Sequence, residues 1–295
     1  MLSVEVMRQV RRLQLRARRA VQTLLGGEYH SVFKGVGLSF DEVREYQPGD
    51  DIRSIDWNVT ARVGSPFIKR FVEERELTVM LVVDVSGSQR FGTQKQPKRA
   101  VAAELAALIA FSAIANNDRV GLIAFSDRVE RYVAPAKGSR HVLRLLRDIL
   151  FFEPERQKTS LKAALDYLNQ VQRRRAIVFS IGDFADEGYD DVFRLTGRKH
   201  DLIAVRVTDP RERELPAIGP IQFEDAETGE FLLIDTSSAS LRRQFADRAT
   251  ARHEALRKLA RSAQVDLVEV GTDGGHFDAL VRFFRLREKR RSRGK

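Results

Sequence analysis

The sequence contains no cysteine at all, which excludes disulfides, iron–sulfur clusters and cysteine-ligated zinc. This absence fits a reducing compartment. No segment reaches the roughly 20 consecutive apolar residues that a transmembrane helix needs. The apolar stretch at residues 20–25 is short and interrupted by two polar residues, so it does not form the core of a signal peptide. We therefore expect a cytoplasmic protein that does not span a membrane.

Acidic residues are scarce at the two ends of the chain. Residues 1–20 carry a net charge of +5 and residues 282–295 a net charge of +7, so the overall charge of +10 leaves the middle at −2. Such ends are typical of a solvated terminal helix and a frayed basic tail. They would also attract an anionic surface, which could be a membrane, a nucleic acid or an acidic protein.

The first quarter of the chain divides into a helix and a small module. Apolar residues at spacings of three and four predict an amphipathic helix over about residues 4–24, followed by two glycines. The next segment shows no long periodicity, and short β-like pieces at 29–33 and 66–71 alternate with polar turns. We therefore expect residues 1–75 to hold an N-terminal helix and a small β-rich module.

From residue 76 strands and helices alternate, which predicts an α/β fold with a doubly wound, mostly parallel sheet and right-handed crossovers. This domain is expected to span 76–286, with a β-hairpin inserted at about 218–236 and a basic tail over 287–295. The expected strands are 77–84, 120–125, 129–133, 176–181, 202–207 and 265–270, and the expected helices are 97–116, 139–151, 160–173, 189–196, 239–263 and 277–286.

One strand end carries a pattern of metal-ligand type. The apolar run 79–83 predicts a fully buried strand, and it ends in Asp84-Val85-Ser86-Gly87-Ser88. Open α/β sheets place their ligands at the carboxyl ends of such strands. An aspartate and two hydroxyls can surround a hard cation there, because Mg²⁺ takes oxygen ligands in octahedral geometry. The D-x-S-x-S spacing resembles the first element of the metal-ion-dependent adhesion site of von Willebrand factor A domains.

Two downstream positions can complete such a site. Thr159 precedes a predicted helix, where it could instead be an N-cap, and Ser160 offers the same chemistry one position along. Asp183 follows the strand predicted at 176–181. The order of the three elements, at intervals of about 70 and 25 residues, resembles a von Willebrand A domain. The alternative is that the hydroxyls cap helices and that Asp183 is a capping or solvated residue. The metal hypothesis assigns one Mg²⁺ or Mn²⁺ to Asp84, Ser86, Ser88, Thr159 and Asp183.

A second motif lies ahead of the predicted sheet. It reads Gly49-Asp50-Asp51-Ile52-Arg53-Ser54-Ile55-Asp56-Trp57 and continues through Thr60-Ala61-Arg62 and Glu73-Glu74-Arg75. Together with residues 28–35 and 43–46, it resembles the signature of the bacterial family called "domain of unknown function 58", which stands directly ahead of a von Willebrand A-like fold. Many members of that family have two N-terminal transmembrane helices, whereas this sequence resembles the short, soluble branch.

The resemblance implies how the site would work. Ser86, Ser88 and Thr159 would approach Mg²⁺ through their hydroxyls, while Asp84 and Asp183 would hold it largely through water. One coordination position would remain open for a carboxylate of a partner. The family is commonly encoded beside MoxR-type AAA ATPases, which implies such an ATPase as the partner. Relatives often have Met after the last serine. Gln89 stands there in this sequence, at a position that is not a ligand.

The charged residues around Trp57 allow two interpretations. They could form a buried ion-pair and stacking network that fixes the module onto the following domain, which is the interpretation we favour. They could instead form a binding surface, because Trp and Arg dominate interface hot spots. The residues concerned are Gly49, Asp50, Asp51, Arg53, Asp56, Trp57 and Arg62.

Motifs of catalysis are missing from the sequence. Phosphatases of the haloacid dehalogenase type use D-x-D, but Ser86 stands in place of the second aspartate. Neither Ser86 nor Ser88 lies in a G-x-S-x-G elbow. The five histidines show no H-E-x-x-H spacing, and no P-loop is present. The glycine-rich residues 271–275 follow the last predicted strand and lack the P-loop lysine, so they are interpreted as a turn.

We therefore expect a non-enzymatic, metal-dependent protein-interaction module with no small-molecule substrate. Two alternatives stay open. The basic ends could bind a nucleic acid or another anionic surface. The strand-end aspartate could serve a metal-dependent phosphotransferase or hydrolase.

Overall fold

The computed structural model of the protein describes residues 4–24, 39–72, 76–154, 158–224 and 230–293. The chain forms two compact units, one made of residues 1–32 and 77–295 and the other of residues 33–76. Within the described ranges, no helix is long and apolar enough to cross a membrane.

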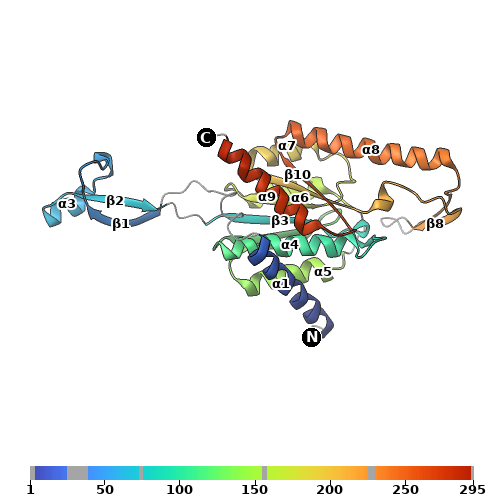
Figure 1. Cartoon of the computed structure of the whole chain (residues 1–295), viewed down its shortest axis with the longest axis horizontal. Helices are drawn as coiled ribbons and strands as arrows, with labels where there is room; N and C mark the ends of the chain where they lie inside the picture. Colours follow the sequence, from blue (N-terminus) through green and yellow to red (C-terminus); the bar gives the residue numbers. More distant parts are fainter. Residues whose placement is uncertain (1–3, 25–38, 73–75, 155–157, 225–229, 294–295) are drawn as a thin grey trace. The chain divides into compact units, whose positions relative to one another are not determined.

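A six-stranded sheet forms the centre of the larger unit, with the strand order β10-β7-β6-β3-β4-β5 (Figure 1). Neighbouring strands pair in parallel, except that β5 runs antiparallel to β4 at one edge. This arrangement confirms the predicted doubly wound, mostly parallel α/β fold. The strands are β3 (Thr78–Asp84), β4 (Arg119–Phe125), β5 (Val129–Ala136), β6 (Ile177–Gly182), β7 (Asp201–Thr208) and β10 (Asp266–Gly271).

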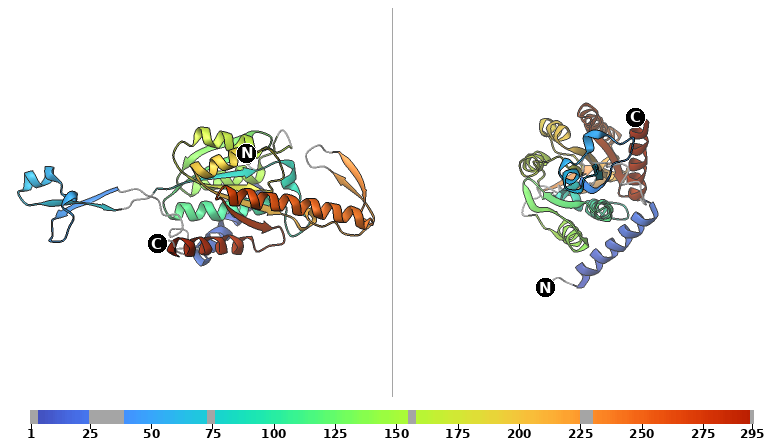
Figure 2. Two further views of the ribbon diagram at one scale, coloured as in Figure 1. Left: turned by 90° about the horizontal axis from the view of Figure 1, so that it is seen from above. Right: turned by 90° about the vertical axis from the view of Figure 1, so that its left-hand side faces the viewer.

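Helices cover both faces of this sheet (Figures 1 and 2). The central strands are almost continuously apolar and buried, as expected for strands with helices on both sides. One face is covered by α1 (Val4–Leu24), α4 (Lys98–Ala115), α5 (Ser139–Phe151) and α9 (His276–Arg293), and the other by α6 (Leu161–Val171), α7 (Asp190–Lys199) and α8 (Ala239–Ser262).

The N-terminal helix α1 belongs to the larger unit and packs against α4 and α5. Its apolar stripe, which includes Val10, Leu13 and Ala17, is buried. Helix α4 is buried on nearly all sides, so it needs a cover on the face turned away from the sheet. The sequence analysis grouped α1 with the β-rich module in residues 1–75, whereas the structure places α1 in the larger unit.

Helix α9 continues through Arg293, where the sequence suggested a separate basic tail over 287–295. The reason is a set of ion pairs with strand ends of the sheet. Arg287 pairs with Asp201 at 2.5 Å and with Asp266 at 3.2 Å. These contacts hold the beginning of the basic segment as helix. The predicted hairpin is present as β8 (Pro220–Glu224) and β9 (Phe231–Asp235), which pair antiparallel.

The smaller unit is built on an antiparallel pair of strands, β1 (Ser39–Glu45) and β2 (Phe67–Val72). The segment between them contains the single helical turn η1 (Ile52–Ser54) and the short helix α3 (Trp57–Val63). The piece predicted at 66–71 is β2, and the piece predicted at 29–33 lies outside the described residues. Strand β1 and helix α3 were not predicted from the sequence. Both have seven residues, and this is too short for a periodicity to stand out.

Candidate metal-binding site

The strand order places a topological switch point between β3 and β6. From β3 the chain proceeds to β4 and β5 on one side, and it then returns to β6 on the other side of β3. Ligands of open α/β sheets bind at the carboxyl ends of the strands beside such a point. Asp84 ends β3, and Asp183 directly follows β6. A Cβ atom at Gly182 would lie 3.0 Å from the Cβ of Asp84, so glycine permits the close approach of the two strand ends.

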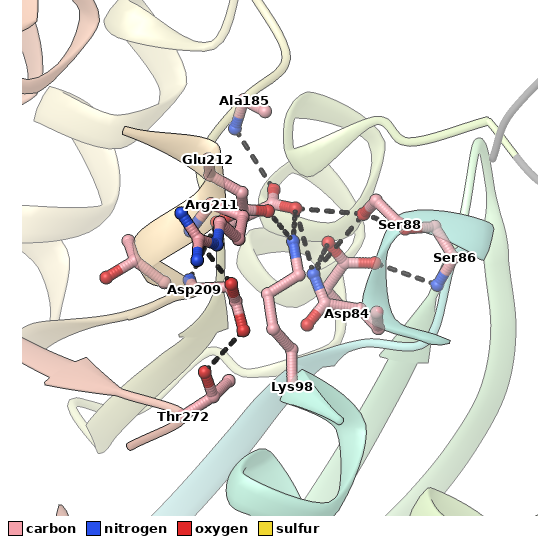
Figure 3. Close-up of polar contacts among 12 residues, drawn as sticks. Asp84, Ser86, Ser88, Lys98, Ala185, Asp209, Arg211, Glu212 and Thr272 are labelled. Atoms are coloured by element: carbon pink, nitrogen blue, oxygen red, sulfur yellow. Dashed lines mark hydrogen bonds and ion pairs between the residues drawn. The ribbon is translucent and has the colours of Figure 1, made fainter. Parts of the chain in front are cut away.

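Four of the five predicted ligands form one hydrogen-bonded cluster (Figure 3). The Oγ atoms of Ser86 and Ser88 lie 3.1 Å apart, and the Ser88 hydroxyl donates to Asp183 Oδ2 at 2.9 Å. The Ser86 backbone N–H donates to Asp84 Oδ1 at 2.9 Å, which folds the chain back over the end of β3. Both aspartates and Ser86 are buried. The predicted D-x-S-x-S and strand-end Asp elements are therefore brought together, although they are separated by 95 residues.

The fifth predicted ligand, Thr159, lies beside this cluster. Thr159 and Asp84 line the same small pocket, together with Gly182 and Asp186. The neighbouring Ser160 has a different role, because its Oγ accepts the backbone N–H of Ala163 and caps α6. Of the two candidate ligands, Thr159 lies at the pocket and Ser160 is the helix cap.

Three polar residues of the cluster were missed by the sequence analysis. Gln89 Nε2 donates to Asp84 Oδ2 at 3.0 Å and to Asp183 Oδ2 at 3.2 Å. Lys98 Nζ lies 2.8 Å from Asp183 Oδ2 and 2.5 Å from Glu212 Oε1. A local signal for Lys98 was present, because a lysine in the first turn of a helix opposes the macrodipole. Gln89 and Glu212 carried no such signal.

The cluster has an excess of negative charge. Burial raises the pKa of Asp84 to about 7, and the charge of the nearby Asp183 adds to this rise. Burial would also raise the pKa of Asp183, but the charge and hydrogen bond of Lys98 outweigh it and lower that pKa below its ordinary value. One ammonium therefore faces Asp183 and Glu212, while Asp84 lacks a direct cationic partner among the contacts of the cluster.

The oxygen atoms of the cluster fit a hard divalent cation. Among the described residues, no group of three or more histidine and carboxylate side chains could hold a metal ion. The set at this sheet edge is of another kind, in which hydroxyls accompany two carboxylates, and Mg²⁺ and Mn²⁺ accept such oxygen ligands. Gln89 Oε1 is buried and has no hydrogen-bond partner in the described part of the chain. The cluster thus still lacks positive charge or a donor.

The residues of the second motif lie in the smaller unit and have mostly local roles. Asp51 accepts the backbone N–H of Arg53 at the start of η1, and Asp56 caps α3. Asp50 forms a two-point ion pair with Arg44. Trp57 is 67% exposed within this unit, so the favoured interpretation, a network that fixes the module onto the following domain, stays a prediction. Gly49 has a positive φ of 110°, a conformation that favours glycine, and Arg53 and Arg62 are exposed.

Comparisons with known proteins place the chain among sequences without an assigned function. A family described as "Protein of unknown function DUF58" matches residues 42–255. Uncharacterized proteins of Mycobacterium tuberculosis and Mycobacterium bovis are each 32% identical over 283 residues, which is 95% of this chain and 89% of each relative. Among solved structures, the conserved hypothetical protein BatB of Bacteroides thetaiotaomicron matches 72% of this chain and 99% of its own, at 13% identity and a TM-score of 0.45. The SpRpn10 VWA domain matches 70% of this chain and 94% of its own, at 12% identity and a TM-score of 0.40.

Proposed function

The chain belongs to the DUF58 family, and we propose that it is a metal-dependent protein-interaction module without catalytic activity of its own. The observation that carries this proposal is the cluster at the switch point, where two serine hydroxyls and two buried aspartates converge from the ends of β3 and β6. Buried carboxylates that face one another need positive charge, and oxygen-only surroundings select a hard cation.

Each residue of the site has a distinct role in this proposal. Ser86, Ser88 and Thr159 supply neutral hydroxyl oxygens, and Asp84 and Asp183 supply the negative charge that retains Mg²⁺ or Mn²⁺. The bound cation supplies an electrophilic centre that takes up a carboxylate of a partner. Neutral hydroxyl ligands favour this capture, because they leave more of the charge of the ion uncompensated.

The surface next to the site supports an interaction role. Phe184, directly after Asp183, has a φ of 55°, which is rare for a bulky residue. Such strained positions persist only where the surroundings hold them, and they gather at functional sites. Here the Phe184 ring packs edge-on against Tyr189 with centroids 6.4 Å apart, while its side chain remains half-buried.

We propose a MoxR-type AAA ATPase as the partner, on the basis of the family resemblance. One metal–carboxylate contact gives too little specificity, so the surrounding surface must add area, on the order of 1,000 Å² in total for a stable complex. The chain itself would contribute binding only, and generic phosphate-ester and acyl-ester substrates should remain unconverted. Turnover that disappears in Asp84→Asn would replace this proposal with the enzyme alternative.

A capture experiment with a purified MoxR-type ATPase tests the proposal. The wild-type chain should retain the ATPase in Mg²⁺ and release it in EDTA. Ser86→Ala should not retain it, whereas Ser112→Ala should. Ser112 is a suitable control because it is also a buried serine, but its hydroxyl donates to Leu108 O within α4.

The same experiment separates this proposal from binding through the basic ends. Arg11 and Arg12 are exposed on α1, so an interaction through that helix would weaken with salt and with neutralisation of these residues, independently of the metal. Capture that is insensitive to EDTA but lost at high salt and in Arg11→Gln/Arg12→Gln would place the interface on α1 and overturn the proposal.

A further inference from the structure

Lys98 is fully buried at the beginning of α4, directly after Pro97. This position is costly for a cation in two ways. Burial removes the ammonium from water, and the N-terminus of a helix carries the positive end of the macrodipole. The first turn of α4 contains no acidic residue that would offset the second cost. The compensation comes from distant parts of the chain, namely Asp183 at 2.8 Å and Glu212 at 2.5 Å.

The ammonium of Lys98 is shared between two carboxylates of different kinds. Asp183 belongs to the proposed metal site, and its side chain is only 7% exposed. Glu212 lies outside that site on the turn η3 (Pro210–Glu212), and its side chain is 30% exposed. The contact of Lys98 with Asp183 uses Oδ2, which is also the oxygen that accepts from Ser88 and Gln89. Lys98 therefore contacts Asp183 at the oxygen that faces the other residues of the proposed site.

We infer that Lys98 is a tethered counter-ion that holds Asp183 in the metal-free protein and competes with the divalent cation for it. This inference rests on the proposed metal site and adds its regulation. When the cation binds, it neutralises Asp84 and Asp183, and Lys98 remains paired with Glu212 alone. Each of the three carboxylates then has a positive partner. In the metal-free protein Asp183 and Glu212 share Lys98, and Asp84 has no cation in contact with it among the described residues.

Glu212 is well suited to retain the displaced ammonium because the structure fixes it firmly. Glu212 Oε2 accepts the backbone N–H of Asp209 at 3.0 Å, which completes a capping box. Asp209 is in turn held by the hydroxyls of Thr93 and Thr272 at 2.5 and 2.6 Å. The free end of the carboxylate, Oε1, thus stays directed at Lys98 (Figure 3).

Two substitutions are expected to change Mn²⁺ binding in opposite directions. Lys98→Met removes the competitor and should tighten binding at least about tenfold, which equals about 1.4 kcal/mol. Glu212→Gln keeps the hydrogen bond to the Asp209 backbone but confines Lys98 to Asp183, so it should weaken binding several-fold. In the double variant Lys98→Met/Glu212→Gln, the Glu212→Gln substitution should change Mn²⁺ affinity little further. Glu212 affects the metal site only through Lys98, and Lys98 is absent from this variant.

Isothermal titration calorimetry of Mn²⁺ measures these affinities, with Lys95→Met as a matched control. Lys95 lies three positions earlier and is exposed, so the same substitution changes the net charge equally without freeing Asp183. Lys95→Met should bind Mn²⁺ within about twofold of wild type, since a solvated charge is well screened. If Lys98→Met does not remain folded in metal-free buffer, Lys98→Gln serves in its place, and Mn²⁺ should raise its Tm more than that of wild type.

The outcomes distinguish this inference from the proposed function. Equal affinities of wild type and Lys98→Met, with binding lost in Ser86→Ala, overturn the role of Lys98 and leave the metal site standing. Binding in Lys98→Met alone supports the competition and overturns metal dependence of the natural chain. Absence of binding in both overturns the site and the inference together. An additive effect of Glu212→Gln in the double variant shows a long-range charge effect and contradicts the transfer of the ammonium.

Discussion

Two buried aspartates, each at the carboxyl end of a strand of the same sheet, have pKa values shifted in opposite directions. Asp209 follows β7 and accepts hydrogen bonds from the hydroxyls of Thr93 and Thr272 and from the backbone N–H groups of Thr93 and Arg211. Burial would raise its pKa, but these hydrogen bonds lower it below the ordinary value. Asp84 ends β3 with donors from Ser86 and Gln89 and with Asp183 nearby, and burial raises its pKa to about 7.

The difference teaches that burial alone does not mark a functional carboxylate. Both residues are at most 2% exposed, but Asp84 lies deeper in the protein than Asp209 and has Asp183 beside it. Depth of burial, hydrogen-bond donors and neighbouring charge together decide the sign of the pKa shift. Asp209 accepts hydrogen bonds from two hydroxyls and two backbone N–H groups, and it connects β7, the loop before α4 and the end of β10. Asp84 has fewer donors and lies near another carboxylate, so it is suited to bind an external cation.

The largest expected effect is on stability at Asp209. Asp209→Ala leaves two hydroxyls and two backbone N–H groups without their acceptor, so it should lower the free energy of unfolding by about 3–5 kcal/mol. Asp84→Ala removes the same atoms but also relieves the repulsion with Asp183, and it should cost about 1 kcal/mol or less at pH 8. Urea denaturation in EDTA measures both. Equal losses in the two variants would erase the distinction between the two sites.

The next effect is the pH dependence of stability in EDTA. A carboxyl whose folded pKa is raised stabilises the fold below its unfolded pKa and loses this contribution as the pH rises through the folded pKa. Asp84 should therefore lower the free energy of unfolding by about 2–4 kcal/mol between pH 4 and 7. Asp84→Asn should remove that decline. Asp209 acts in the opposite direction, because its lowered pKa makes its contribution disappear as the pH falls below about 4. Parallel curves for wild type and Asp84→Asn would contradict the raised pKa.

A smaller gain is expected from metal. Mn²⁺ at about ten times its dissociation constant should stabilise the wild-type chain by about 1.4 kcal/mol, by mass action alone. Asp84→Asn should gain less under the same conditions, since it lacks one of the two charges that retain the ion. Thermal unfolding with and without Mn²⁺ provides the comparison, and an undiminished gain in Asp84→Asn would remove this aspartate from the metal site.

The smallest effect is on the metal-free stability of Ser88→Ala. The Ser88 hydroxyl is part-buried. When this hydroxyl is removed, Asp183 still keeps its contacts with Lys98 and Gln89. We expect a loss below about 1 kcal/mol in urea denaturation, together with a marked loss of Mn²⁺ affinity. A large loss of stability would instead mean that the hydroxyl has a structural role like those of Thr93 and Thr272.

The sequence predicted the sheet and four members of the cluster because their signals are local. The buried run 79–83 and the D-x-S-x-S spacing each lie within a few residues, and strand ends of a parallel sheet meet at one edge. Lys98 and Glu212 were missed because Lys98 meets Asp183 across 85 residues and Glu212 across 114 residues, and the position of Lys98 at a helix start does not name its partners. The placement of α1 on α4 was missed for a similar reason, since an amphipathic pattern shows that a helix needs a partner but not which one.

The most direct test of the account is a calorimetric Mn²⁺ titration of wild type, Ser86→Ala and Ser112→Ala under identical conditions. Both serines are buried, but only Ser86 lies in the cluster, and the Ser112 hydroxyl is satisfied within its own helix. The account predicts one Mn²⁺ bound by wild type and by Ser112→Ala with equal affinity, and a clear loss in Ser86→Ala. Equal binding by all three proteins, or no binding by wild type, would contradict it.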